Sequence, residues 1–283
     1  MTSAFVVPHE FNLLASSNPA DGALNITPDG SRFTVQLDNP IMIPKAALNV
    51  TIDVEQATIW WVVPNIITGQ NDKLYITAPS VGDVLTPYVV TVPQGLYDLT
   101  GLNQAIQREL SNLGAKIAPE SVITLSPDDA TNKVEVRLPY LGTSIDFTPA
   151  DTFRDILGFN SQVIPPTIVA PDVILADNTA QFNTIDYFLL HSDLCDEGIR
   201  INNKYSETVA QVLIDSPPGS QIVYAPFNPA RVSANRLAGA RRSRLLFYLT
   251  DGEGKAVNTN GEFFSMRLSI RYLMPHTLRG HEV

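Results

Sequence analysis

Few side chains in this sequence can do chemistry, and the only thiol belongs to Cys195. A cysteine nucleophile needs a positioned histidine base. His191 lies close before Cys195, but a strand pattern around the two residues would leave them on one face at some distance. A lone cysteine among apolar and polar neighbours is more often a small core residue. We therefore expect Cys195 to be buried and not catalytic.

The histidines and the clustered acids do not form a metal-binding pattern. The four histidines are His9, His191, His276 and His281, and no pair has the spacing of a zinc site. One cysteine cannot complete a structural zinc site either. Asp193, Asp196 and Glu197 offer the oxygen ligands that calcium uses, but a polar loop is the simpler interpretation. We predict no metal site and no cofactor.

Two patterns that often mark enzymes are incomplete or missing. The segment Asp251–Ala256 resembles a phosphate-binding loop, but Leu249 stands where its first glycine belongs and Ala256 where Ser or Thr belongs. A hairpin turn explains its glycines better. The sequence has no Gly-x-Ser-x-Gly motif of a serine nucleophile. We predict that the protein is not an enzyme; catalytic acids that meet only in space would leave no pattern to find.

The chain is acidic overall, yet several arginines lie close together. Its formal net charge is −10, which argues against nucleic acid as the main partner. A loop-like stretch contains Arg231, Arg236, Arg241, Arg242 and Arg244. A solvated loop and a contact with an acidic neighbouring subunit both explain this cluster, and no aromatic residues interleave to stack bases. Arg231, Arg236, Arg241 and Arg242 are therefore candidate subunit-interface residues.

The sequence gives no targeting or membrane signal. Residues 1–10 lack a basic region followed by a long apolar run, so we expect no signal peptide. No stretch approaches the ~20 apolar residues of a membrane-spanning helix. Charged residues make up 17% of the chain, which is low for a globular protein. We expect a soluble product of a reducing compartment, with part of its surface covered by partners.

Strand patterns dominate both ends of the chain. The clearest is Phe263–Tyr272, in which apolar side chains alternate with serines and arginines, as in a half-buried strand. Similar runs occur at residues 32–37, 47–63, 73–77, 185–190, 208–215, 221–225 and 244–250. Turn-forming segments rich in Pro, Gly and Asn separate them. Many strands with such turns predict a mainly β protein, either a sandwich or a barrel.

The middle of the chain follows a different pattern. Apolar residues recur at helical spacing at Leu99, Leu102, Ile106, Leu110 and Leu113. Asp98 or Thr100 can cap this helix, and Gly114 can end it. A hairpin over residues 121–138, a strand at 144–147 and a second helix after Thr148 follow. Strand, helix, hairpin, strand and helix together predict a small α+β module.

The simplest organisation is one β-domain with this module inserted in a loop. Residues 1–85 and 171–283 would form the β-domain, and residues 86–170 the module. Insertions at loop tips cost little closure entropy when the ends of the inserted unit lie close. Two or three domains in series are the alternative, but the first β-rich segment is short for a core of its own.

Trp60 and Trp61 are adjacent in a strand-like run, so their side chains point to opposite faces. We expect one of them in the core. The other would be exposed on a monomer, which fits a buried subunit contact or a sugar-binding platform. Both are candidate interface residues.

Several segments, in order along the chain, resemble the minor capsid, or penton, proteins of polinton-like viruses and virophages. They are residues 57–66, 92–99 with Leu102 and Asn103, 214–220, 249–254 and 260–263. Each is short, and the ordered set is more specific than any member. The resemblance implies a single jelly-roll sandwich without catalytic residues or cofactor. It also implies pentamers at the vertices of an icosahedral capsid, with contacts to a major capsid protein, in virions assembled inside the host cell.

Three other functions remain open from the residues alone. A receptor- or carbohydrate-binding β-sandwich, such as a spike or lectin, would use exposed aromatic and carboxamide side chains. A trimeric major capsid protein would need two full jelly rolls, which are cramped in 283 residues if the middle is α+β. An enzyme on a β fold has no motif in its favour.

Overall fold

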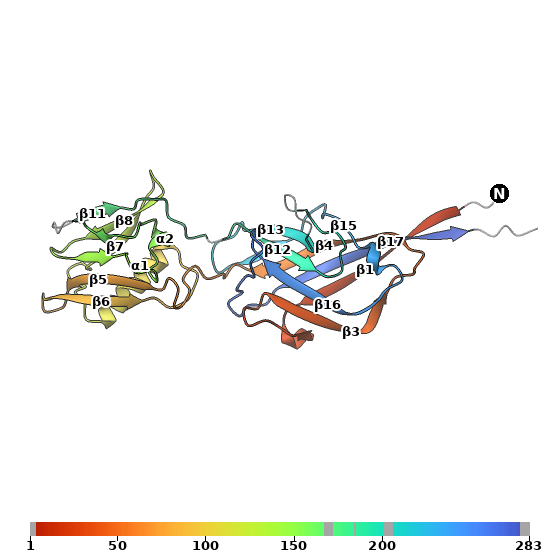
Figure 1. The fold of residues 1–283 in the computed structure, drawn as a ribbon, viewed down its shortest axis with the longest axis horizontal. Helices are drawn as coiled ribbons and strands as arrows, with labels where there is room; N and C mark the ends of the chain where they lie inside the picture. Colours follow the sequence, from red (N-terminus) through yellow and green to blue (C-terminus); the bar gives the residue numbers. More distant parts are fainter. Residues whose placement is uncertain (1–3, 167–171, 184, 201–205, 278–283) are drawn as a thin grey trace, which may run out of the picture. The chain divides into compact units, whose positions relative to one another are not determined.

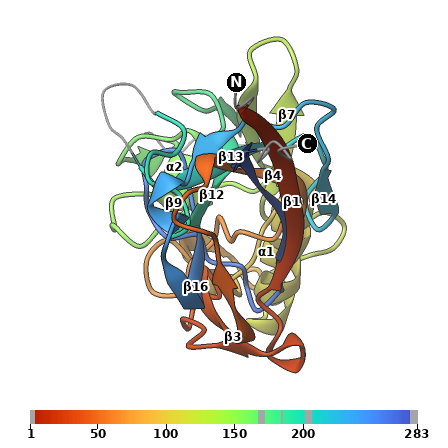
Figure 2. The same cartoon turned by 90° about the vertical axis from the view of Figure 1, so that its right-hand side faces the viewer.

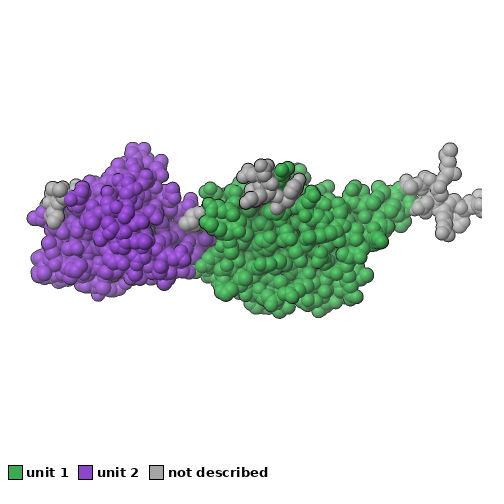
Figure 3. Space-filling view, viewed as in Figure 1, with its two compact units in different colours: residues 1–62, 185–283 green, residues 63–184 purple. Residues whose placement is uncertain are grey.

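The chain forms two compact units in a computed structural model, which describes residues 4–166, 172–183, 185–200 and 206–277. Unit 1 is Met1–Val62 with Ile185–Val283, and unit 2 is Val63–Thr184 (Figure 3). Unit 1 is therefore built from both ends of the chain, and unit 2 is inserted between them. No helix in the described ranges is long and apolar enough to cross a membrane.

Unit 1 consists of two antiparallel sheets (Figures 1 and 2). The first has the order β1-β17-β4-β14, with the short β15 also paired to β4, and the second has the order β13-β12-β16-β3-β2. The strands are β1 (Ala4–Ser16), β2 (Ala23–Leu24), β3 (Arg32–Met42), β4 (Leu48–Trp60), β12 (Tyr187–Ser192), β13 (Thr208–Leu213), β14 (Gln221–Tyr224), β15 (Val232–Ser233), β16 (Arg241–Thr250) and β17 (Ser265–Thr277).

The main strands of unit 1 pair in a nested order. The first pairs with the last, β1 with β17, and the following pairs are β3 with β16, β4 with β14 and β12 with β13. In addition, β17 pairs with β4 and β16 with β12, which joins the nested pairs into two sheets. This order defines a jelly roll. The predicted fold class, a mainly β protein with a jelly-roll sandwich and an inserted α+β unit, is confirmed.

Alternation of side chains explains why one face of each strand is buried. In β17, Met266, Leu268 and Ile270 are fully buried, whereas Arg267 is exposed on the other face. Within the second sheet, the paired residues Phe33 of β3 and Phe247 of β16 stack their rings, with 5.4 Å between the centroids. Each large apolar side chain buried in this way contributes about 1.5–3 kcal/mol to stability.

Unit 2 packs one long helix against two small sheets with the orders β10-β9-β5-β6 and β11-β8-β7. Its elements are β5 (Lys73–Pro79), β6 (Leu85–Thr91), α1 (Leu99–Asn112), β7 (Thr124–Asp128), β8 (Lys133–Leu138), β9 (Ser144–Asp146), α2 (Arg154–Leu157), β10 (Val163–Ile164) and β11 (Asp172–Leu175). Leu102, Ile106 and Leu110 of α1 are buried in one core with Val90 and Phe147. Unit 2 therefore has a core of its own.

The long helix agrees with its sequence pattern, and the short one does not. The Asp98 carboxylate accepts a hydrogen bond of 2.6 Å from the Gly101 N–H, so Asp98, one of the two predicted caps, is the N-cap of α1. The second helix begins at Arg154 instead of next to Pro149. The expected cap, Thr148, donates its hydroxyl hydrogen to Asp146 at the end of β9, so the chain before α2 forms a turn instead.

The boundaries of the inserted unit differ from the expected 86–170. β5 and β6 pair with each other, and β5 also pairs with β9, so both strands belong to unit 2 and the unit begins at Val63. The expected end at residue 170 lies outside the described residues, and β11 beyond it still pairs with β8. Period-two alternation shows that residues 73–77 form a strand, but it does not show which sheet the strand joins.

Trp61 lies directly after β4, and its substitution tests the jelly-roll core. It is 1% exposed, and its ring meets the ring of Phe188 edge-on, with 6.1 Å between the centroids. We predict that Trp61→Ala lowers the free energy of unfolding by about 3–5 kcal/mol because it leaves a cavity. Urea denaturation followed by circular dichroism measures the change. The half-buried Trp60 is the matched control, and equal losses for Trp60→Ala and Trp61→Ala would contradict the assignment.

Candidate functional site

The two tryptophans differ in their surroundings. Trp61 is a core residue, so its assignment to a subunit interface is corrected: the side chain offers no surface to a partner. Its neighbour Trp60 is half-buried at the end of β4, where it pairs with Gln221 of β14. The prediction that one tryptophan of the pair lies in the core is confirmed, and only Trp60 remains as a candidate contact residue.

The arginines that are close in sequence do not form one patch. The Arg231 guanidinium lies 3.8 Å from the Asp53 carboxylate, and that of Arg236 lies 3.3 Å from Asp196. Both therefore have acidic partners within the chain, which argues against their assignment to an interface. Arg241 and Arg242, at the start of β16, have no carboxylate within 4.0 Å in the described part of the chain. These two stay candidates for an external contact.

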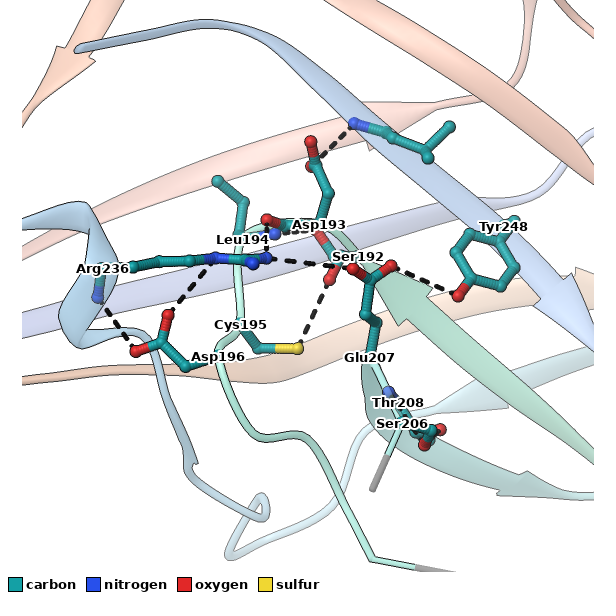
Figure 4. Close-up of polar contacts among 11 residues, drawn as sticks. Ser192, Asp193, Leu194, Cys195, Asp196, Ser206, Glu207, Thr208, Arg236 and Tyr248 are labelled. Carbon is teal, nitrogen blue, oxygen red and sulfur yellow. Dashed lines mark hydrogen bonds and ion pairs between the residues drawn. The ribbon is translucent and has the colours of Figure 1, made fainter. Parts of the chain in front are cut away.

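Arg236 ties together the connection between β12 and β13 (Figure 4). Its guanidinium donates to the Asp193 carbonyl, and its backbone N–H donates to Asp196 at 2.9 Å. It also lies 4.0 Å from Glu207, which accepts a hydrogen bond from the Tyr248 hydroxyl. The guanidinium thus links residues of this connection to one another, and through Glu207 it links them to Tyr248 of the second sheet.

The three acids that offer oxygen ligands for calcium have other partners. Asp193 accepts a hydrogen bond of 2.9 Å from the Leu246 N–H, and Asp196 is paired with Arg236. Glu197 forms an isolated backbone bridge with Ser233. Among the described residues, no group of three or more His, Cys, Asp or Glu side chains is arranged to hold a metal ion. The arrangement fits the expected polar loop.

A second polar cluster lies on the outer face of the first sheet. Asp53 of β4 is fully buried and is bonded to Arg271 of β17, which also contacts Glu10 of β1 at 2.9 Å and Glu55 at 3.2 Å. Burial raises the pKa of Asp53, and the charge of Arg271 opposes that rise. The hydrogen bond from Arg271 lowers the pKa of Glu10. One guanidinium therefore clamps three neighbouring strands.

Three arginines meet on the outer face of the second sheet. Arg32 of β3 and Arg242 and Arg244 of β16 line an open hollow of about 550 Å³, together with Asn25, Thr34 and Asp193. We call this set of residues the basic hollow. The sequence cluster contained Arg242 and Arg244 but not Arg32, which lies far away in the chain. The only sequence signal for Arg32 was its outward position in the alternating run 32–37, and the pairing of β3 with β16 brings it here.

Cys195 and His191 are both buried. Burial raises the pKa of the Cys195 thiol to about 11, so the thiol is protonated near neutral pH, and its Sγ donates to the Ser192 carbonyl at 3.4 Å. The expectation of a small core cysteine is confirmed. His191 lies between two threonine hydroxyls: its Nε2 is 2.8 Å from Thr250 Oγ1 and its Nδ1 is 3.2 Å from Thr208 Oγ1.

The hydrogen bonds of His191 define its tautomer. The Thr250 hydroxyl donates to the Asp251 carbonyl at 3.0 Å, so it accepts from Nε2–H, and Nδ1 accepts from Thr208. Burial lowers the pKa of His191 to about 4, which keeps the ring neutral near pH 7. The ring is neutral with both nitrogens bonded to threonine hydroxyls, and the thiol is protonated and bonded to a backbone carbonyl, so the two do not form a nucleophile with its base.

The family model of a bacterial Ig-like domain matches residues 12–112, about a third of the chain. The match runs across the boundary between the two units and ends within α1. No curated protein matches. The chain is similar to the crystal structure of the mavirus penton protein, with 14% identity, 94% of this chain and 100% of that chain covered, and a TM-score of 0.45. It is also similar to a chain of the Sputnik virophage, with 14% identity, 93% and 97% covered, and a TM-score of 0.39.

The buried histidine makes stability depend on pH. The pKa of His191 is about 4 in the folded chain and 6.5 as its ordinary value, so protonation opposes folding. Its contribution is complete above pH 6.5 and is lost as the pH falls towards 4, by on the order of 3 kcal/mol in total. We predict that His191→Gln flattens the change of unfolding free energy between pH 7 and pH 4. His276→Gln, at an exposed site, should keep the wild-type slope, and identical slopes for all three proteins would contradict the assignment.

The ion pair between Arg271 and Asp53 on the first sheet predicts strong energetic coupling between these two residues. Arg271→Met leaves Asp53 buried without its main partner, which should cost about 3–5 kcal/mol of unfolding free energy. In an Asp53→Asn background the same change should cost much less, because no buried charge remains. A double-mutant cycle in urea measures the coupling. Additive effects of the two substitutions would show that the pair is not coupled.

Proposed function

We propose that this protein is a structural subunit of a virus capsid, the minor one that forms pentamers at icosahedral vertices. The observation that carries the proposal is the nested strand pairing of unit 1, with the first strand paired to the last. This jelly roll is a fold used by many viral capsid proteins, and also by lectins and cupins. The ordered resemblance to penton proteins favours the capsid role among these. Such a role needs no catalytic residue.

The segments that carry the resemblance lie at connections of the fold. Residues 57–66 lead from β4 into unit 2, and residues 214–220 join β13 to β14. Within the first of these segments, the side chain of Asn65 is 2% exposed and bonds both the N–H and the C=O of Tyr97, at 2.9 and 2.7 Å. Tyr97 belongs to another segment of the resemblance, so these shared residues fix the entry to the inserted unit.

A ring of five copies needs two different surfaces that match each other, because its contacts are heterologous. The open edges of the jelly roll offer such surfaces. On one side, Leu213 of β13 is 63% exposed and Val223 of β14 is 58% exposed, and both line a groove of about 260 Å³. On the other side, Leu14 of the edge strand β1 is 70% exposed. We infer that the β13–β14 edge of one copy meets the β1 edge of the next.

The capsid role also implies partners beyond the ring. We propose that the pentamer contacts a major capsid protein and that the protein resides in the virion after assembly in the host cell. The far end of β1 pairs only with β17, at Phe5 and Val6 opposite His276 and Pro275, and continues past the rest of the jelly roll (Figure 1). Two-stranded ribbons are marginal alone in water, so a neighbouring capsid subunit is a suitable cover for it.

Light scattering of the purified protein tests the oligomer. We expect a mass of about 155 kDa, five times the 30.9 kDa of one chain. The double substitution Leu213→Lys and Val223→Lys should convert pentamers to monomers, because it places charges in the apolar contact. Val84→Lys in unit 2, where the wild-type side chain is 64% exposed, is the matched control and should leave the pentamer intact.

Other measured masses would support other functions. A stable trimer would contradict the vertex role and favour a major capsid protein. A chain that stays monomeric at its highest soluble concentration and binds a glycan array would favour a receptor- or carbohydrate-binding protein. Loss of pentamers in the Val84→Lys control as well would show that the contact was placed on the wrong edge.

A further inference from the structure

The basic hollow gathers positive charge on a chain that is acidic. The formal net charge of the protein is −10, yet three guanidiniums line this one hollow. Within the ranges that the structure describes, no carboxylate oxygen lies within 4.0 Å of the guanidinium of Arg242 or Arg244. The Arg32 guanidinium contacts the Tyr248 ring instead of an acid. The arginines that form ion pairs among the described residues, such as Arg236 and Arg271, do so with acids of their own unit. The hollow therefore has positive charge available for a partner.

A row of side chains on adjacent strands of the second sheet holds Arg32 in place. The Arg32 guanidinium lies 5.5 Å from the centroid of the Tyr248 ring, in a cation–π contact. On its other side the Tyr248 ring stacks on His191, with 4.3 Å between the centroids and 5° between the planes. Hydrogen bonds to Thr208 of the next strand, β13, and to Thr250 of β16 hold the histidine. A guanidinium held by such a row loses less entropy than a freely moving one when it binds an anion.

The hollow also contains one acid of fixed position. The Asp193 carboxylate accepts a hydrogen bond from the Leu246 N–H (Figure 4), which fixes its position in the lining of the hollow. Three arginines and this aspartate leave a formal charge of +2 on the lining. Two carboxylates would neutralise that charge, and guanidiniums bind carboxylates through paired hydrogen bonds.

We propose that the basic hollow is a binding site for an acidic peptide segment of a partner protein, held by carboxylate contacts to Arg32, Arg242 and Arg244. Nucleic acid fits less well. A phosphate backbone needs a continuous basic stripe and is repelled by a chain of net charge −10. Base stacking needs exposed aromatic faces, whereas the one ring at this place, Tyr248, is covered by Arg32 and His191. This inference does not depend on the capsid role.

Fluorescence anisotropy with a labelled penta-glutamate peptide tests the site on the full chain at low ionic strength. We expect saturable binding that weakens as salt is added, because the contacts are ionic. A penta-glutamine peptide of the same length should not bind. The double substitution Arg242→Gln and Arg244→Gln should weaken binding about tenfold or more, since it removes two charge-assisted contacts.

The matched control is Arg241→Gln, on the same strand but outside the hollow. It should bind penta-glutamate as the wild type does. The conservative pair Arg242→Lys and Arg244→Lys keeps the charge but loses the paired geometry, so an intermediate affinity is expected. Thermal unfolding of each variant, followed by circular dichroism, shows that the fold is intact and assigns any loss to the site.

Three results would overturn the proposal. The first is equal weakening by Arg241→Gln, which would show attraction to overall surface charge. The second is tighter binding of an octathymidine oligonucleotide at the same arginines, which would identify a nucleic-acid site. The third is unchanged penta-glutamate affinity in the folded double variant. None of these outcomes affects the oligomer mass, so they leave the test of the capsid role separate.

Discussion

The pairing of β1 with β17 is the contact on which the rest of unit 1 depends. The two strands come from opposite ends of the chain and pair along their whole length, from Ala4 with Thr277 to Ser16 with Ser265. Closing so long a loop costs conformational entropy, although the cost grows only slowly with length. Burial of the inner faces of both sheets offsets it. With this pair formed, β3 with β16, β4 with β14 and β12 with β13 complete the nested order.

Because the sheets close in this way, the connection from β4 to β12 carries no strand of the sandwich. It can hold an entire unit with its own core, in which α1 packs against two small sheets. The same closure leaves strand edges at β1 and at β13 and β14, where exposed aliphatic side chains gather. Edges of this kind favour association, and a closed ring of copies would cover them.

The arginines on the outer faces of the two sheets have different partners. On the first sheet, Arg271 lies among Asp53, Glu10 and Glu55, and the charges are satisfied within the unit. On the second sheet, Arg32 rests on Tyr248 instead of an acid, next to Arg242 and Arg244. A buried charge destabilises the fold unless it is paired, whereas an exposed charge is solvated and remains available to bind a partner. The first arrangement stabilises the fold, and the second leaves a surface suited to recognition.

The sequence alone determined the local features of this protein. Its alternating runs predicted many strands, though not β1, and Asp98 or Thr100 was the predicted cap of α1. The single cysteine and the scattered histidines argued against a catalytic or metal site. The tertiary structure decided which strands pair, and therefore that β5 and β6 belong to unit 2. It also separated Arg231 and Arg236 from their sequence neighbours and brought Arg32 to Arg242 and Arg244. Local patterns reflect the preferences of a few consecutive residues, but contacts between distant strands depend on the burial of the whole core.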